Sequence, residues 1–296
     1  MGAMEPKQRT VQCLSPRGLH KIAYLEWGDP SNSNVLICAH GLTRCARDFD
    51  ALAAAMADRY RVICPDTAGR GSSGWLADPM LYGIPQYVAD MVTLIARLDV
   101  EQVDWVGTSM GGLIGMALAA QPGSPIAKLV LNDAGPVVTK VSLERIATYV
   151  GMAPVFPDFA TAVQYVRTVS ASFGPHTDDE WKFLTEIVVR RQPDGRYKMH
   201  YDPALAEPFK HQMPEGDLEL WPFYDAIRSK MLVLRGELSD LLKRETCDAM
   251  TQRGPKAKIV EIPGVGHAPT LMHADQIAVV RDFLLPRPRR PASHPA

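Results

Sequence analysis

Short runs rich in β-branched residues alternate along the chain with longer stretches in which apolar residues recur at helical spacing. This alternation is typical of an α/β fold, in which a mostly parallel β-sheet is connected by helices that cover both of its faces. Because the carboxyl ends of parallel strands meet at one edge of a sheet, we expect functional residues to follow the strands. The expected strands are 20–27, 35–39, 61–64, 103–107, 128–132, 231–235 and 258–262, and the expected helices are 49–56, 87–98, 112–121 and 276–285.

The alternation stops between about residues 137 and 221, where helical segments rich in aromatic residues run without a clear strand. We interpret 137–221 as an inserted helical cap, and 8–136 together with 222–286 as the core. Within the cap, Pro193-Asp194-Gly195 is a turn signal, so a small hairpin or loop is expected to interrupt the helices there.

The balance of charged residues indicates which classes of partner the protein can bind. Lys and Arg total 32 against 33 Asp and Glu, which gives no electrostatic basis for binding nucleic acid or an anionic membrane, so small-molecule chemistry fits better.

The sequence shows no targeting or membrane segment. Residues 1–10 lack the apolar stretch of a secretory signal, and no segment approaches the roughly 18 apolar residues of a membrane span. With five widely spaced cysteines, the expectation is a soluble, reduced, cytoplasmic protein; its oligomeric state leaves no mark in the sequence. The Pro-rich basic end, 287–296, is expected to be a disordered tail.

A serine stands at an expected turn from strand to helix. Gly107-Thr108-Ser109-Met110-Gly111 lies between a β-branched run and a stretch of small residues with helical pattern. Such a turn holds the serine in a strained backbone conformation, and glycines on both sides let the strand and the helix approach each other closely. The pattern therefore predicts a nucleophile elbow that presents the hydroxyl of Ser109.

A serine hydroxyl is a poor nucleophile alone and needs a histidine within hydrogen-bond reach, held in turn by a carboxylate. His267 is the best candidate base, because it follows the last expected strand on a loop loosened by glycines. Asp240, after the penultimate strand, is our first choice for the acid. Asp133, which follows another strand, ranks second, and Glu237 is nearer the strand end and could serve instead.

His40-Gly41-Leu42 follows the expected strand 35–39, and its glycine allows a tight turn that presents backbone N–H groups. Such amides form an oxyanion hole, for which we predict the N–H of Leu42 and that of Met110, the residue after the nucleophile. His40 is interpreted as a structural residue that hydrogen-bonds the loop. The glycine-rich segment 66–73 lacks the ending of a phosphate-binding loop and is assigned a loop-shaping role.

These motifs, in the order Ser, Asp, His, resemble the α/β-hydrolase superfamily, and the match spans about residues 21–285. The resemblance implies an α/β-hydrolase fold with an eight-stranded, mostly parallel sheet, helices on both faces and an inserted helical cap. The elbow looks like that of capped carboxylesterases, lactonases and hydrolases of carbon–carbon bonds. A serine at 109 argues against the haloalkane dehalogenase and epoxide hydrolase branches, whose nucleophile is a carboxylate. One departure is Arg70, where relatives often carry His.

The main functional hypothesis is a serine hydrolase, a carboxylesterase, that cleaves a small-molecule carboxylic ester through an acyl-enzyme and needs no metal or other cofactor. The alternative is a hydrolase of carbon–carbon bonds or enol-lactones acting on acidic ring-cleavage products, which requires a cation facing the elbow. Arg190 and Arg191 are the candidates for that cation, although a solvated helix end is the more ordinary interpretation. Trp221 is a possible substrate-binding residue among the cap aromatics. A non-catalytic ligand-binding protein on the same fold is the third hypothesis.

Overall fold

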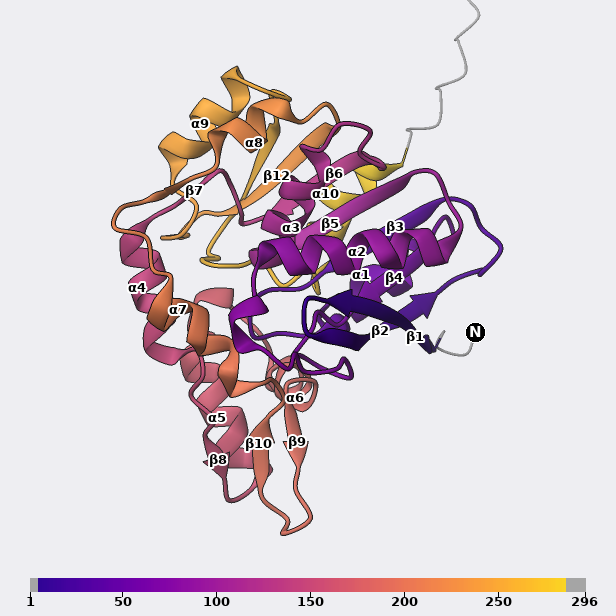
Figure 1. Ribbon diagram of the computed structural model, residues 1–296. Helices are drawn as coiled ribbons and strands as arrows, with labels where there is room; N and C mark the ends of the chain where they lie inside the picture. The colour runs from indigo at the N-terminus through magenta and orange to yellow at the C-terminus, as the bar shows by residue number, and fades with distance from the viewer. Residues whose placement is uncertain (1–4, 286–296) are drawn as a thin grey trace, which may run out of the picture.

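The computed structural model describes residues 5–285, which contain a central sheet of eight strands in the order β1-β2-β4-β3-β5-β6-β12-β13 (Figure 1). From β4 to β13 the neighbouring strands are parallel, whereas β2 pairs antiparallel with both β1 and β4. The expected α/β-hydrolase sheet is thereby confirmed. The strands are β1 (Lys7–Ser15), β2 (Gly18–Trp27), β3 (Val35–Ala39), β4 (Arg61–Pro65), β5 (Val103–Thr108), β6 (Ile126–Asn132), β12 (Lys230–Gly236) and β13 (Lys258–Ile262).

Helices cover both faces of this sheet, as predicted. The buried side chains of two of them form one apolar layer, and those of the other four form the layer on the opposite face. The first pair is α1 (Asp50–Met56) and α10 (Ala274–Leu284); the second group is α2 (Ile84–Leu98), α3 (Met110–Ala119), α8 (Trp221–Ala226) and α9 (Arg244–Gln252).

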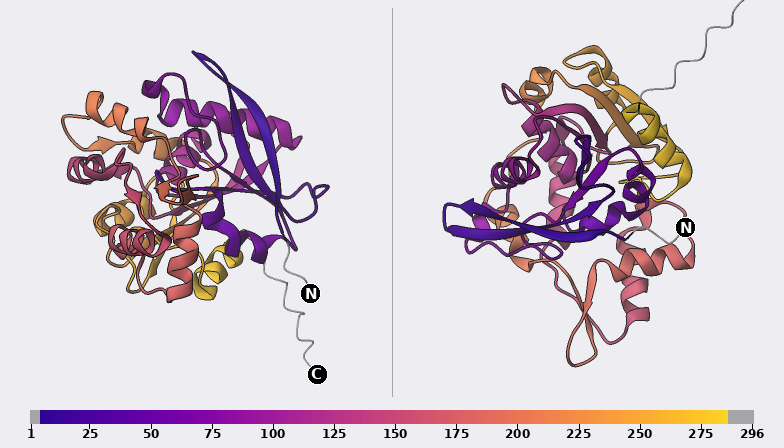
Figure 2. Two further views of the ribbon diagram at one scale, coloured as in Figure 1. Left: turned by 90° about the horizontal axis from the view of Figure 1, so that it is seen from below. Right: turned by 90° about the vertical axis from the view of Figure 1, so that its right-hand side faces the viewer.

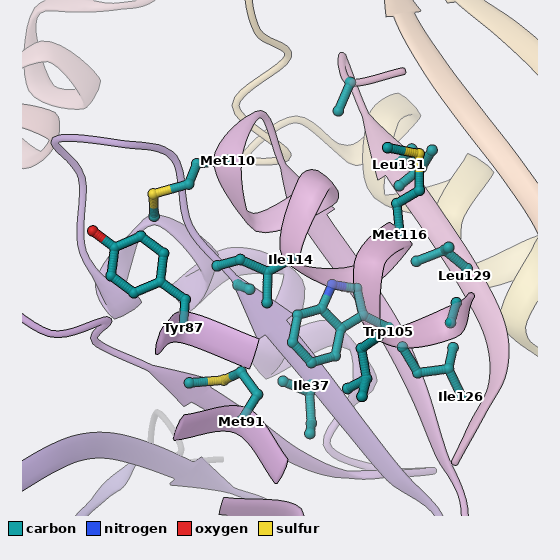
Figure 3. Close-up of a cluster of buried hydrophobic side chains, with 14 of the residues drawn as sticks. Ile37, Tyr87, Met91, Trp105, Met110, Ile114, Met116, Ile126, Leu129 and Leu131 are labelled. Carbon is teal, nitrogen blue, oxygen red and sulfur yellow. The ribbon is translucent and has the colours of Figure 1, made fainter. Parts of the chain in front are cut away.

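The larger apolar layer is centred on Trp105 of β5, which is fully buried (Figure 3). The indole Nε1–H of Trp105 donates to the carbonyl of Gly111 at 3.0 Å, so this large side chain satisfies its polar atom on the first turn of α3. Figure 3 also shows Tyr87 of α2 beside Met110 at the start of α3. The core thus holds α3, the helix that begins at the elbow, against both the sheet and α2.

Smaller elements lie between β6 and β12, and we keep the name cap for residues 137–221. In Figures 1 and 2 this part lies to one side of the large sheet, with the β9–β10 hairpin projecting from it. The hairpin confirms the turn predicted at 193–195. The elements are β7 (Val137–Val138), α4 (Lys140–Tyr149), β8 (Val155–Phe156), α5 (Phe159–Val169), α6 (Asp178–Glu186), β9 (Val189–Arg191), β10 (Tyr197–Met199), α7 (Glu207–His211) and β11 (Leu218–Glu219), with 3-10 turns η3 (Ala171–Phe173) and η4 (Pro203–Ala206).

Three features of the fold differ from the sequence expectation or lie beyond it. Strand β1 was not expected, because it is an edge strand whose first four residues are exposed and therefore carries little apolar signal. The cap contains short strands among its helices. The tail predicted at 287–296 lies outside the described residues.

All five cysteines are buried, and none of them forms a disulfide. In the part of the chain that the structure describes, no helix is both long enough and apolar enough to cross a membrane.

Candidate active site

Ser109 occupies the turn between β5 and α3, with backbone angles φ 50° and ψ −114°. A non-glycine residue adopts a positive φ only when its surroundings enforce it, which is the strain expected of an elbow. Those surroundings are backbone atoms in close approach. A Cβ on Gly111 would lie 2.0 Å from the carbonyl oxygen of Ala39, and one on Gly107 would lie 2.2 Å from that of Gly111. The two glycines are therefore required for β3, β5 and α3 to meet at the serine.

A continuous chain of hydrogen bonds leads from the serine to a buried carboxylate. Ser109 Oγ lies 2.9 Å from His267 Nε2, and His267 Nδ1 lies 2.6 Å from Asp133 Oδ2. Because the carboxylate can only accept, the imidazole carries its proton on Nδ1 and leaves the lone pair of Nε2 facing the serine hydroxyl. This geometry is the one expected of a nucleophile, a base and an orienting acid.

Asp133 follows β6 and is completely buried. Its Oδ1 accepts from the backbone N–H of Gly236 at 2.9 Å, and its Oδ2 accepts from Ser239 Oγ at 2.6 Å in addition to His267. Donors on both oxygens fix the orientation of the carboxylate.

Asp240, our first choice for the acid, does not contact His267, and the second-ranked Asp133 takes that place. Asp240 is 57% exposed and forms an ion pair with Arg145 of α4. The physical reason is the path of the loop after β12, which wraps around the guanidinium of Arg235. Arg235 donates to the carbonyls of residues 237, 239 and 242, and this turns the side chain of Asp240 outward. Glu237, the other alternative, instead accepts from the N–H of Gly264.

The predicted oxyanion-hole residues lie beside the serine. Leu42 and Met110 both line a cavity together with Ser109. Within residues 5–285, neither the N–H of Leu42 nor that of Met110, the first residue of α3, donates a hydrogen bond. Two free donors next to the nucleophile are suited to a developing oxyanion.

His40 is hydrogen-bonded to two loops, the one at Gly41 and the one at Thr67, as expected of a structural residue. Its Nδ1–H donates to the carbonyl of Gly41 at 2.7 Å, while its Nε2 accepts from the N–H of Thr67 at 3.0 Å. Burial away from solvent lowers the pKa of His40 to about 3, so the ring is neutral at physiological pH.

Arg70, in the loop after β4, has a structural role that the sequence analysis did not identify. It is fully buried, and its guanidinium donates to the carbonyls of Leu42 (2.8 Å) and Ala68 (2.6 Å) and to the hydroxyl of Tyr87 (2.7 Å). A further N–H approaches Met110 Sδ at 3.4 Å. Arg70 thereby contacts both predicted oxyanion-hole residues. The signal in the sequence was the departure from the family pattern at position 70.

Two cavities open on either side of the serine, and only Ser109, Leu42 and Ile146 line both. The larger, of about 340 Å³, is lined by His267 and by both polar and apolar residues of core and cap. The smaller, of about 170 Å³, is lined almost entirely by apolar side chains.

None of the three predicted substrate-binding residues lines either cavity. Arg190 and Arg191 belong to strand β9 of the projecting hairpin rather than to a helix end, and the guanidinium of Arg190 donates to His200. Trp221 of α8 packs against the guanidinium of Arg253, 4.3 Å from the ring centroid. Arg44 and Arg145 are the cations that line the larger cavity. The sequence could not identify Arg145, because its position depends on how α4 of the cap folds over the core.

One group of side chains away from the serine has the composition of a metal site. Cys13, His20 and Asp90 are buried between the β1–β2 hairpin and α2, with ligand atoms within 4.8 Å of one another. His20 Nε2 is hydrogen-bonded to Asp90 Oδ1 at 2.9 Å, and Gln86 donates to the same oxygen, so this group also forms a hydrogen-bonded structural cluster without an ion.

Comparisons with known proteins agree with the fold. A model of the alpha/beta hydrolase family matches residues 36–280. A 3-hydroxybutyrate-oligomer hydrolase of Cupriavidus necator is 53% identical over 285 residues, which cover 94% of this chain and 97% of that protein. The crystal structure of an alpha/beta hydrolase from Novosphingobium aromaticivorans has a TM-score of 0.85 and 37% identity, covering 96% of this chain and 99% of that one.

The crystal structure of a putative hydrolase from Rickettsia typhi is similar, with a TM-score of 0.87 and 33% identity, covering 95% of this chain and 99% of that one. The family match spans most of the chain, and the identity to the Cupriavidus hydrolase extends over nearly its whole length. This chain therefore belongs to the alpha/beta hydrolase family and is a hydrolase.

Proposed function

We propose that this protein is a serine esterase that hydrolyses short oligomers of 3-hydroxybutyrate. The hydrogen-bonded series Ser109, His267 and Asp133 is the observation that carries the reaction type. The substrate class comes from the 53% identity to a 3-hydroxybutyrate-oligomer hydrolase along nearly the whole chain. Two cavities meeting at the serine suit an ester, which presents one group on each side of its carbonyl.

In the proposed reaction, Ser109 Oγ attacks the ester carbonyl while His267 Nε2 takes the hydroxyl proton. The N–H groups of Leu42 and Met110 hold the oxyanion, and each such donor is worth about 10² to 10³ in rate. His267 then gives the proton to the leaving alkoxide, so an alcohol departs and an acyl-enzyme remains. Water, deprotonated by His267, attacks the acyl group and releases a carboxylic acid and the free serine. Asp133 keeps the imidazole in the required tautomer throughout.

The carbon–carbon hydrolase hypothesis required a cation facing the elbow, for which Arg190 and Arg191 were the candidates. Both lie on the projecting hairpin and neither lines a cavity at Ser109. With the cations that it named away from the serine, this hypothesis has less support than the ester, which rests on the 53% identity to a 3-hydroxybutyrate-oligomer hydrolase.

The test is turnover of the dimer of 3-hydroxybutyrate by the wild type and by Ser109→Ala, with the released monomer measured by liquid chromatography. We expect release by the wild type, loss of all but residual turnover in the variant, and an unchanged thermal unfolding midpoint. A fluorophosphonate probe should label only the wild type. Equal monomer release by both proteins would contradict the proposed nucleophile, and no release by the wild type would contradict the proposed substrate.

A further inference from the structure

The two cavities at Ser109 differ in the residues that could take part in proton transfer. His267 and its loop neighbours Ala268 and Pro269 line the larger cavity only. The smaller cavity instead contains Met110 and Leu113 of α3. In it, the only polar side-chain groups among the lining residues, besides Ser109, are the hydroxyls of Tyr82 and Tyr87. The serine therefore stands between a chamber that contains the base and a largely apolar chamber without it.

The position of His267 determines which part of the ester, the alcohol or the acyl group, lies in which cavity. The leaving oxygen must receive its proton from His267 Nε2, so the alcohol part of the ester must lie on the side of the imidazole. That is the larger cavity. The acyl part then extends into the smaller, apolar cavity. The two volumes, about 340 and 170 Å³, allow a longer leaving alcohol than acyl group.

Two arginines also line the larger cavity, and they differ in how many of their N–H groups are free to bind a substrate. Arg44 is largely buried, and all three nitrogens of its guanidinium already have partners. Its Nε and Nη2 bind Asp48, and its Nη1 approaches the carbonyl of Leu184. The ring of Phe173 covers one face of the guanidinium. Arg145 binds Asp240 only through Nη1 and Nη2. Within the described residues its Nε–H has no acceptor, and the side chain is 47% exposed.

We infer that the larger cavity binds a leaving alcohol that carries a carboxylate, and that Arg145 is the residue that binds this carboxylate. A guanidinium has five N–H donors in a planar fork, so the Nε edge of Arg145 can take a second carboxylate while Asp240 holds the terminal nitrogens. Asp240 competes for the same charge and weakens the attraction. The inference rests on the proposed ester hydrolysis and makes Arg145 a specificity-determining residue at the end of the leaving group.

The experiment compares two dimers of 3-hydroxybutyrate, the free acid and its methyl ester, which differ only in the terminal charge. Cleavage of the internal ester bond is followed by chromatography of the monomers for the wild type, Arg145→Gln, Arg145→Lys and Asp240→Asn. Arg196→Gln is the matched control, because Arg196 forms an ion pair of similar exposure with Asp194 on the hairpin, away from both cavities.

We expect the wild type to prefer the free acid by about fivefold in KM, the upper end for a partly exposed ion pair. Arg145→Gln should abolish the preference without changing KM for the methyl ester, and Arg145→Lys should restore part of it. Asp240→Asn should lower KM for the free acid, because it removes the competing charge. Arg196→Gln should behave as the wild type.

Equal kcat/KM for the two dimers in the wild type, or a preference that persists in Arg145→Gln, would overturn the inference while leaving ester hydrolysis intact. A parallel rise in KM for both dimers in Arg145→Gln would mean a structural role and would also overturn it. Absence of turnover of both dimers would overturn the proposed function and this inference with it.

Discussion

Replacement of Asp133 by asparagine tests the most specific feature of the site, the identity of the acid. Asp133 Oδ2 accepts hydrogen bonds from both Ser239 Oγ and His267 Nδ1, at 2.6 Å each, while Oδ1 accepts from the N–H of Gly236. An asparagine amide that keeps its oxygen on Gly236 presents an NH₂ group to the other two partners. His267 must then accept at Nδ1 and carry its proton on Nε2, where it can no longer take the proton of Ser109.

The loss follows from that tautomer. Removal of the orienting acid in a serine triad, or its conversion to the amide, costs about 10⁴-fold in kcat. At 1.36 kcal/mol per factor of ten, this corresponds to about 5 kcal/mol of transition-state stabilisation. Because the amide and the carboxylate have nearly the same shape, KM should change little. The fall should therefore appear in kcat for any ester, whether or not it is charged.

The assay is steady-state hydrolysis of a p-nitrophenyl ester and of the 3-hydroxybutyrate dimer, with circular dichroism to verify the fold. Glu237→Gln is the matched control: Glu237 is an exposed acid that follows the neighbouring strand β12 and accepts from Gly264, so its amide should retain the wild-type kcat. A loss of less than tenfold in folded Asp133→Asn would refute the reasoning. An equal loss of kcat in Asp240→Asn would return the acid role to Asp240.

Two further predictions concern the elements that hold the site. Burial lowers the pKa of His40 to about 3, so between pH 6.5 and about 3 only the unfolded state binds this proton, and His40 should make the unfolding free energy fall by about 1.4 kcal/mol per pH unit as the pH drops. Other groups, such as His200, also titrate between pH 7 and 4 in both proteins. In urea titrations over this range the stability of the wild type should therefore fall more steeply than that of His40→Gln by about this slope, and parallel slopes would contradict the prediction. Gly111→Ala would place a Cβ 2.0 Å from the backbone oxygen of Ala39 and should cost at least about 3 kcal/mol of stability in urea unfolding, so an unchanged midpoint would contradict the close approach.

The sequence predicted the parts of the site that depend on local chain geometry. The elbow is a property of consecutive residues, because Gly107 and Gly111 allow the turn and the adjacent patterns supply the strand and the helix. His267 was identifiable for a similar reason, since it follows the last strand directly on a glycine-containing loop. The oxyanion residues follow from the tight turn after β3. In each case the residues that create the geometry lie within a few positions of the functional group.

The acid and the substrate-facing cations depend instead on contacts between distant segments. Asp133 and Asp240 follow neighbouring parallel strands, β6 and β12, and both could have reached His267 from the sequence pattern alone. Their separation is decided by the loop that wraps around Arg235, which no periodicity records. Arg145 reaches the larger cavity only because α4 of the cap folds over the core. Arg190 could be excluded from the site only once the structure showed that its strand, β9, projects from the cap and lines neither cavity at Ser109.

The end of β6 supports both the serine turn and the histidine loop, which is consistent with the proposed place of the acid there. Asn132 is fully buried; its carbonyl accepts from the N–H of Ser109 at 2.9 Å, and its side-chain nitrogen donates to Thr108 Oγ1 and to the carbonyl of Pro269. The next residue, Asp133, binds His267. Two adjacent residues thus fix the strand before the serine, the serine itself and the loop of the histidine. In the proposed triad, an acid after β6 therefore ties base and nucleophile to one rigid strand end.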